Sequence, residues 1–77
     1  MMPNSFRLTD VVALLRDVPS HGLRRGQVGT VVDQYRSGRF EVEFADADGQ
    51  TVAMATLPGT ALLRLSYETT KRRAKVA

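Results

Sequence analysis

The sequence predicts an all-β protein, a small antiparallel barrel of four to five short strands. From Arg39 to Phe44, apolar residues alternate with charged ones, the pattern of a strand with one face in water. Runs rich in valine and threonine lie elsewhere in the chain, and turn sequences containing glycine separate them. Several short strands joined by tight turns in a chain of 77 residues are typical of a barrel.

The first apolar run, Val11 to Leu15, has two interpretations. Its valines and leucines, together with Leu8, also fit one face of a helix, for which Thr9 is a suitable cap. We favour a strand because the run is short, opens with two β-branched residues and is soon followed by Pro19. Residues 11–15 are thus predicted as a strand, with a short helix as the alternative.

The centre of the chain predicts two hairpins. Gln27 to Gln34 reads as a strand rich in valine and threonine, in which Gly29 marks either a bulge or a close approach of the backbone. The sequences from Tyr35 to Gly38 and from Asp46 to Gly49 each place a glycine where a tight turn needs a positive φ. The strand from Arg39 to Phe44 lies between these turns and belongs to both hairpins.

Gln50 to Leu57 supplies a fourth strand made of smaller residues. We expect Val52 and Met54 to face the same core as Phe40. A Pro-Gly pair then ends this strand.

A short strand, Leu62 to Leu65, is expected to close the sheet after a helical turn at Thr60 and Ala61. So short a last strand leaves an edge with unpaired backbone groups, which a second copy of the chain can pair with. The sequence is therefore compatible with a homodimer. The predicted domain limits are 7–66 for the barrel and 67–77 for a tail.

The formal net charge of +3 comes entirely from the predicted tail. From Met1 to Leu65 there are seven basic and seven acidic residues, so the body has no formal net charge. The tail contains one acidic residue, Glu68, and four basic residues, Lys71, Arg72, Arg73 and Lys75. Because this block has no useful periodicity and like charges repel, we predict a flexible, disordered basic tail at 67–77.

Composition argues against several function classes. The chain has no cysteine, which excludes disulfides and thiolate metal sites, and we expect no cofactor. Asp17, Ser20 and His21 have the residue types of a hydrolytic triad, but such triads are assembled across a fold rather than within one loop. We therefore predict that the protein is not an enzyme. The opening residues lack the pattern of a secretory signal, and no apolar run is long enough to cross a bilayer. We expect a cytoplasmic protein without a membrane partner.

The chain resembles a known family through three segments. DVVALLRDVPSHGLRRGQVGTVVD is followed by FEVEFADADGQTVAMATL and by a final LLRL. Their order and spacing resemble the small bacterial proteins grouped as domain of unknown function 4926, over about Leu8 to Leu65. The resemblance implies a stand-alone SH3-like barrel without an established activity and without catalytic residues to transfer. A looser similarity, carried by Gly26, Gly29 and Val31, runs to KOW-type barrels of ribosomal and transcription proteins.

The connection from Val18 to Gly26 is the leading candidate for recognition. It is longer than the other predicted connections, and long ordered loops on rigid scaffolds are where binding residues concentrate. Leu23 is either an exposed apolar anchor or a plug in the core. We predict a noncatalytic module that binds a protein partner through this loop. The candidate interaction residues are His21, Leu23, Arg24 and Arg25.

Nucleic-acid binding of the KOW type is the alternative function. Basic residues that contact phosphates give salt-dependent affinity, and the tail together with loop arginines offers such residues. In this hypothesis Arg24 and Arg25 join the arginines of the next turn in one basic patch. The further candidate contacts are Arg36, Arg39, Lys71, Arg72, Arg73 and Lys75.

Overall fold

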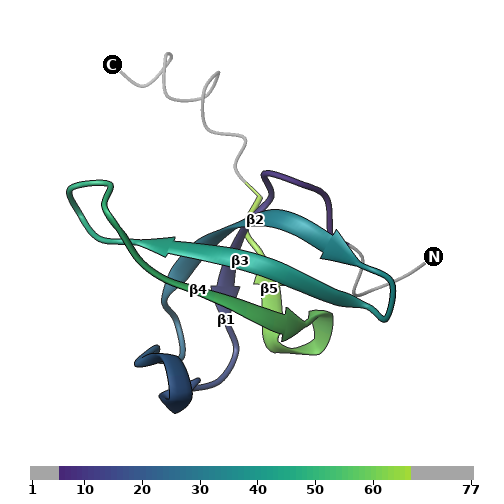
Figure 1. Ribbon diagram of the computed structural model, residues 1–77, viewed down its shortest axis with the longest axis horizontal. Helices are drawn as coiled ribbons and strands as arrows, with labels where there is room; N and C mark the ends of the chain where they lie inside the picture. Colours follow the sequence, from purple (N-terminus) through teal and green to yellow (C-terminus); the bar gives the residue numbers. More distant parts are fainter. Residues whose placement is uncertain (1–5, 67–77) are drawn as a thin grey trace.

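A computed structural model describes residues 6–66, which form one antiparallel sheet of five strands (Figure 1). The predicted tail, 67–77, lies outside the described residues. Within the described part, no helix has the length and apolar character needed to span a membrane. The strands are β1 (Val11–Leu14), β2 (Val28–Tyr35), β3 (Arg39–Ala45), β4 (Thr51–Pro58) and β5 (Leu62–Arg64), with single 3₁₀ turns η1 (Pro19–His21) and η2 (Gly59–Ala61).

The strand order β4-β3-β2-β1-β5 confirms the all-β class and decides the interpretation of the first apolar run. β1 is a strand rather than a helix, because it pairs with β2 on one side and with β5 on the other. β2, β3 and β4 follow one another as two hairpins, whereas β5 returns through η2 to lie beside β1. β4 and β5 are the two edges of the sheet.

Both predicted hairpin turns form around a glycine in the left-handed region. Gly38, between β2 and β3, has a φ of 78°, and Gly49, between β3 and β4, has a φ of 82°. In the second turn, Oδ1 of Asp46 accepts hydrogen bonds from the backbone N–H groups of Asp48 at 2.9 Å and Gln50 at 3.0 Å. Asp46 therefore stabilises the turn by binding its own backbone.

The core is built around Phe44, which lies between two small residues. Its cross-strand neighbours on the buried face are Gly29 in β2 and Ala53 in β4. A Cβ atom placed on Gly29 would lie 2.8 Å from the Phe44 ring and 2.7 Å from Cγ1 of Val42. Of the two interpretations of Gly29, the close approach is therefore the correct one. The irregularity in β2 comes later, between Val31 and Asp33.

The expectation that Val52 and Met54 face the core is wrong. Their side chains are 55% and 45% exposed, whereas Ala55 and Leu57 are buried. Leu57 pairs with Phe40, and the two-residue period of a strand then places Ala55 and Ala53 on the buried face. A register shift next to the β3–β4 turn leaves Val52 as the extra residue of β4. Because Val42 and Phe44 of β3 are bulky, the small side chains of Ala55 and Ala53 opposite them are enough to fill the core.

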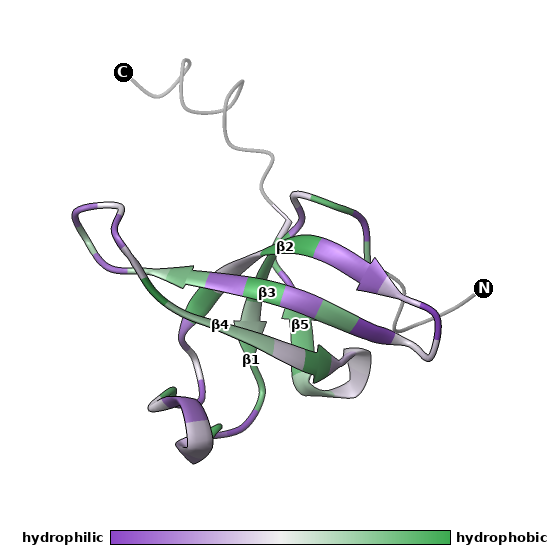
Figure 2. Cartoon of the chain, viewed as in Figure 1, coloured by the Kyte–Doolittle hydropathy of each residue, from purple (hydrophilic) through white to green (hydrophobic). Residues whose placement is uncertain are grey.

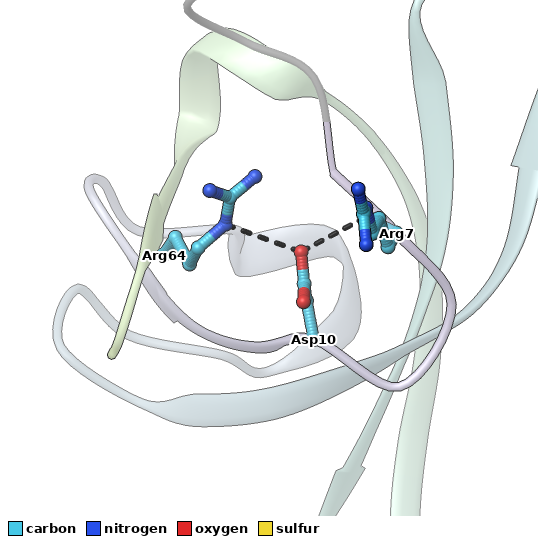
Figure 3. A network of polar contacts seen from close by, with 3 residues as sticks. All are labelled: Arg7, Asp10 and Arg64. Atoms are coloured by element: carbon cyan, nitrogen blue, oxygen red, sulfur yellow. Dashed lines mark hydrogen bonds and ion pairs between the residues drawn. The ribbon is translucent and has the colours of Figure 1, made fainter. Parts of the chain in front are cut away.

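The N-terminal segment is fastened to the sheet by a clasp formed by Phe6, Asp10 and Arg64. Figure 3 shows its polar part, in which Asp10 lies between Arg7 and Arg64. Phe6, which precedes the predicted start of the barrel, is 5% exposed and packs edge-on against Phe40 with ring centroids 5.1 Å apart. The Arg64 guanidinium lies 5.5 Å from the Phe6 centroid and donates through Nε to Oδ2 of Asp10 at 3.2 Å. The same oxygen accepts the backbone N–H of Arg7 at 2.9 Å, so one carboxylate joins both ends of the described chain.

Replacing Gly29 with alanine tests the packing of the core. We expect Gly29→Ala to lower the free energy of unfolding by about 1–3 kcal/mol, because the new methyl group collides with Phe44 and Val42. The added cost should fall in a Val42→Ala background, which removes the nearest atom. Denaturant unfolding measures both effects, with the neighbouring Thr30→Ala as control. Equal unfolding midpoints for Gly29→Ala and the parent would contradict the close approach.

The observed register of β4 predicts different losses of stability for two apolar residues of this strand, because they lie on opposite faces. Leu57→Ala should cost about 2–5 kcal/mol because it opens a cavity in the core. Met54→Thr should change stability by less than about 0.5 kcal/mol because Met54 is on the solvent side. Thermal or denaturant unfolding ranks the two variants. A larger loss of stability in Met54→Thr than in Leu57→Ala would instead support the expectation that Met54 faces the core.

Candidate interaction surfaces

The loop between β1 and β2 is held in shape by its own backbone. Val18 and Leu23 exchange two hydrogen bonds, at 2.9 and 3.1 Å, and so form a single antiparallel bridge. Between them, η1 closes with the N–H of Gly22 donating to the carbonyl of Pro19 at 3.0 Å, and Gly22 has a φ of 68°. The predicted recognition loop is therefore an ordered miniature hairpin.

Two side chains and one backbone hydrogen bond to β1 hold the base of this loop. The backbone N–H of Arg25 donates to Oδ1 of Asp17 at 2.8 Å, and that of Arg24 donates to Oε1 of Gln27 at 2.7 Å. Gly26, with a φ of 92°, donates its N–H to the carbonyl of Leu14 at 2.8 Å. Asp17 and Gln27 thus stabilise the loop backbone.

Leu23 is a plug in the core rather than an exposed anchor. Its side chain is 2% exposed and belongs to the hydrophobic cluster that includes Phe44. Of the two alternatives for Leu23, the core plug is therefore the correct one, and Leu23 is not a surface contact residue; it forms a backbone bridge with Val18. A shallow hollow of about 330 Å³ remains beside it, lined by Asp17, Pro19, Gly22, Leu23 and Arg24.

The other predicted loop residues, His21, Arg24 and Arg25, are on the surface. Nδ1 of His21 lies 3.0 Å from Oγ of Ser20. Asp17 accepts a backbone N–H at the base of the loop. Among residues 6–66, no three histidine, aspartate or glutamate side chains gather as a metal-binding group.

The structure does not bring the arginines into one patch. Arg24 and Arg25 precede β2, whereas Arg36 and Arg39 lie at or beyond its other end. Because a strand rises about 3.3 Å per residue, the eight residues of β2 separate the two pairs by roughly 25 Å. In Figure 1, η1 and the β2–β3 turn are on opposite sides of the molecule. Lys71, Arg72, Arg73 and Lys75 lie outside the described residues.

The sheet surface that points away from the core, here called the outer face, carries an apolar row that the sequence analysis missed. Leu63 of β5 pairs with Ala13 of β1, which in turn pairs with Val28 of β2. Leu63 and Val28 are 51% and 49% exposed, and Ala13 is half-buried. Leu15, which follows β1, is 47% exposed. These side chains form an apolar strip across three strands.

A second row on the outer face runs beside the first and includes one acidic residue. It contains Val11, Thr30, Glu43 and Met54, from β1, β2, β3 and β4 in turn. Figure 2 shows the alternation of hydrophilic and hydrophobic residues along β3. The apolar residues at the alternate positions Phe40, Val42 and Phe44 are buried, so the charged residues lie on the opposite face. Glu43 is half-buried and accepts a hydrogen bond from the hydroxyl of Thr51.

Next along β3, Glu41 pairs with Asp33 of β2. Oε1 of Glu41 accepts the hydroxyl of Thr56 at 2.6 Å and that of Tyr35 at 3.4 Å. Partial burial raises the pKa of Tyr35 above its ordinary value of 10.0, and the negative charges of Glu41 and Asp33 raise it further. The phenol therefore keeps its proton to a higher pH than an ordinary tyrosine does.

Comparison with protein-family models places this architecture in a family. The model for the domain of unknown function DUF4926 matches residues 8–64, which include all five strands. The chain belongs to the DUF4926 family. The resemblance noted in the sequence is thereby confirmed. No curated protein matches the chain, and no solved structure does.

The outer face of this DUF4926 member escaped the sequence analysis for a definite reason. Leu63, Ala13 and Val28 are distant in sequence and meet only through strand pairing. One local signal pointed to it: within residues 11–15, the buried positions are Val12 and Leu14, so strict alternation places Leu15 outside. This alternation is informative only if residues 11–15 are already known to form a strand rather than a helix.

The acidic region of the DUF4926 chain predicts the titration of Tyr35. Glu41→Gln should lower the pKa of Tyr35, because it removes the nearest negative charge and an acceptor that favours the neutral phenol. An ultraviolet pH titration checks this in a Tyr67→Phe background, which leaves one tyrosine. Asp48→Asn is the charge-matched control. An unchanged pKa in Glu41→Gln would contradict the assignment.

The sign of the linked stability change follows from the raised pKa. The folded chain holds the Tyr35 proton more tightly than the unfolded chain, so this contribution is fully present below pH 10.0. It is lost as the pH rises through the higher pKa of the folded state.

Proposed function

We propose that the protein is a noncatalytic module that binds a protein partner through its outer face. The observation that carries the proposal is the row Leu63–Ala13–Val28, in which two large apolar side chains, each about half exposed, lie on the two strands that flank β1. Contiguous exposed apolar residues rimmed by polar ones are typical of protein-binding surfaces, whereas isolated ones are not informative. Pairing of β1 with β2 and β5 positions these side chains before a partner binds, which lowers the entropy lost on binding.

The predicted recognition loop contributes the rim of this surface rather than its centre. The loop leaves the sheet next to Leu15 and re-enters it at Val28, so its ordered backbone borders the apolar row. Arg24 and Arg25 are exposed there and carry charge for steering or specificity. Because Leu23 is in the core, the apolar contact of the interface comes from the sheet.

Nucleic-acid binding remains the alternative, and the structure supports it less well. Glu41, Glu43 and Asp33 lie on the outer face of β2 and β3, where they repel phosphates. The arginines that were expected to act together are at opposite ends of β2. A nucleic-acid mode would have to rely on the loop arginines and on 67–77, and it predicts a steep loss of affinity with salt.

Site-specific crosslinking tests the proposed interface. A photoreactive amino acid is introduced at Val28 or Leu63 in the full chain, and a third variant carries it at Leu8, which is 53% exposed but lies before β1. After irradiation in the cells that produce the protein, positions 28 and 63 should give the same crosslinked protein and position 8 should not.

A second pair of variants separates the centre of the interface from its rim. Leu63→Ser should abolish recovery of that partner in moderate salt, while Leu8→Ser should leave it unchanged. Recovery of nucleic acid instead of protein, or equal crosslinking at all three positions, would overturn the proposal.

A further inference from the structure

The outer face combines an apolar strip with an acidic region that Arg39 borders at the start of β3. Glu43 lies in the row Val11–Thr30–Glu43–Met54, and the pair Asp33–Glu41 lies in the next row. Neither row contains a basic residue; the nearest base on β3 is Arg39, at the start of that strand. The acidic side chains accept hydrogen bonds from hydroxyl groups, but no ion pair with them occurs within residues 6–66. A segment that fits this face therefore carries positive charge.

The chain leaves the sheet at the end of this same row. The backbone N–H of Leu65 donates to the carbonyl of Val11 at 2.8 Å, immediately after β5. Val11 pairs with Thr30, and Thr30 pairs with Glu43. The residues that follow Leu65 thus start three strands away from Glu43.

The sequence beyond the described residues has the complementary charge and sufficient length. It carries Lys71, Arg72, Arg73 and Lys75, with Glu68 as its only acid. Neighbouring strands are about 4.8 Å apart, so Glu43 is roughly 14 Å from the strand position of Leu65. An extended chain covers about 3.3 Å per residue, so Lys71 can reach about 20 Å from Leu65. The basic cluster spans the distance with some slack.

We propose that residues 67–77 dock in cis across the outer face, with their basic cluster on Glu43, Glu41 and Asp33. This inference rests on the proposed function, since it concerns the same face, and it specifies the chemistry of the partner. Exposed ion pairs are individually weak and screened by salt, so the docked segment is displaced readily. A partner that replaces it must present a basic segment to β2 and β3 and apolar side chains to the Leu63–Val28 row.

A paramagnetic label tests the docking in the full chain. Because the sequence has no cysteine, Ala74→Cys provides a single thiol for a nitroxide. In the isotope-labelled protein at low salt, the amide signals of Val11, Thr30 and Glu43 should lose intensity. Signals of the β1–β2 loop, such as that of Ser20, should keep theirs. Raising the salt concentration should restore the lost intensity.

Charge variants identify the surface that holds the segment. Glu43→Gln combined with Glu41→Gln should restore the outer-face signals, whereas Asp48→Asn, an exposed acid in the next turn, should not. Broadening that is uniform over the surface, or that persists in the double variant, would overturn the proposal. A mixture of isotope-labelled chain without nitroxide and unlabelled chain with nitroxide should show no broadening. Broadening in that mixture would indicate docking onto a second copy, and would also overturn it.

Failure of this inference is distinguishable from failure of the proposed function. If the nitroxide leaves the outer face unaffected while Val28 and Leu63 still crosslink to one protein, the face binds a partner and 67–77 does not cover it. If the nitroxide broadens the outer face and no protein crosslinks there, the segment docks and the proposed function is wrong.

Discussion

The packing of Phe44 against Gly29 is the constraint on which the rest of the structure depends. The absent side chain at position 29 lets the ring lie directly on the backbone of β2. Because side chains alternate along a strand, a slip of one residue would send Phe44 and Val42 into water and bring Glu43 into the core. The contact therefore fixes which residues of β3 are buried, and through β3 it fixes the faces of β2 and β4.

Much of the fold could be predicted because its signals are local. The alternation of β3 and the glycines of the two turns are contained in short windows of sequence. β4 misled the prediction because its inward residues are alanines, which are less apolar than the outward Val52 and Met54. Its true alignment depends on the register shift beside Ala45 and on the bulk of Phe44, neither of which can be read from β4 itself.

The candidate site, like the fold, could be predicted only where its signals are local in the sequence. The loop from Val18 to Gly26 was visible as a long connection, but whether Leu23 pointed inward depended on its bridge with Val18. The outer-face row was invisible because its members come from three strands at different places in the chain. The charge distribution could be read from the sequence, which shows a neutral body and a basic segment. The structure adds that the chain leaves the sheet beside Val11, in the row that contains Glu43.

The clasp of Phe6, Asp10 and Arg64 also has a kinetic consequence. The β2–β3 and β3–β4 hairpins close short loops, which is fast, whereas the Asp10–Arg64 contact joins residues 54 positions apart. Pairing of β5 with β1 joins segments that are similarly far apart in sequence, so we expect these contacts to form late in folding. By the same reasoning the three residues of β5 are the least costly part of the sheet to release. Transient opening of this edge would detach Leu63 from Ala13 while the β2–β4 meander stays folded. The apolar row and the point where the chain leaves the sheet would then open together.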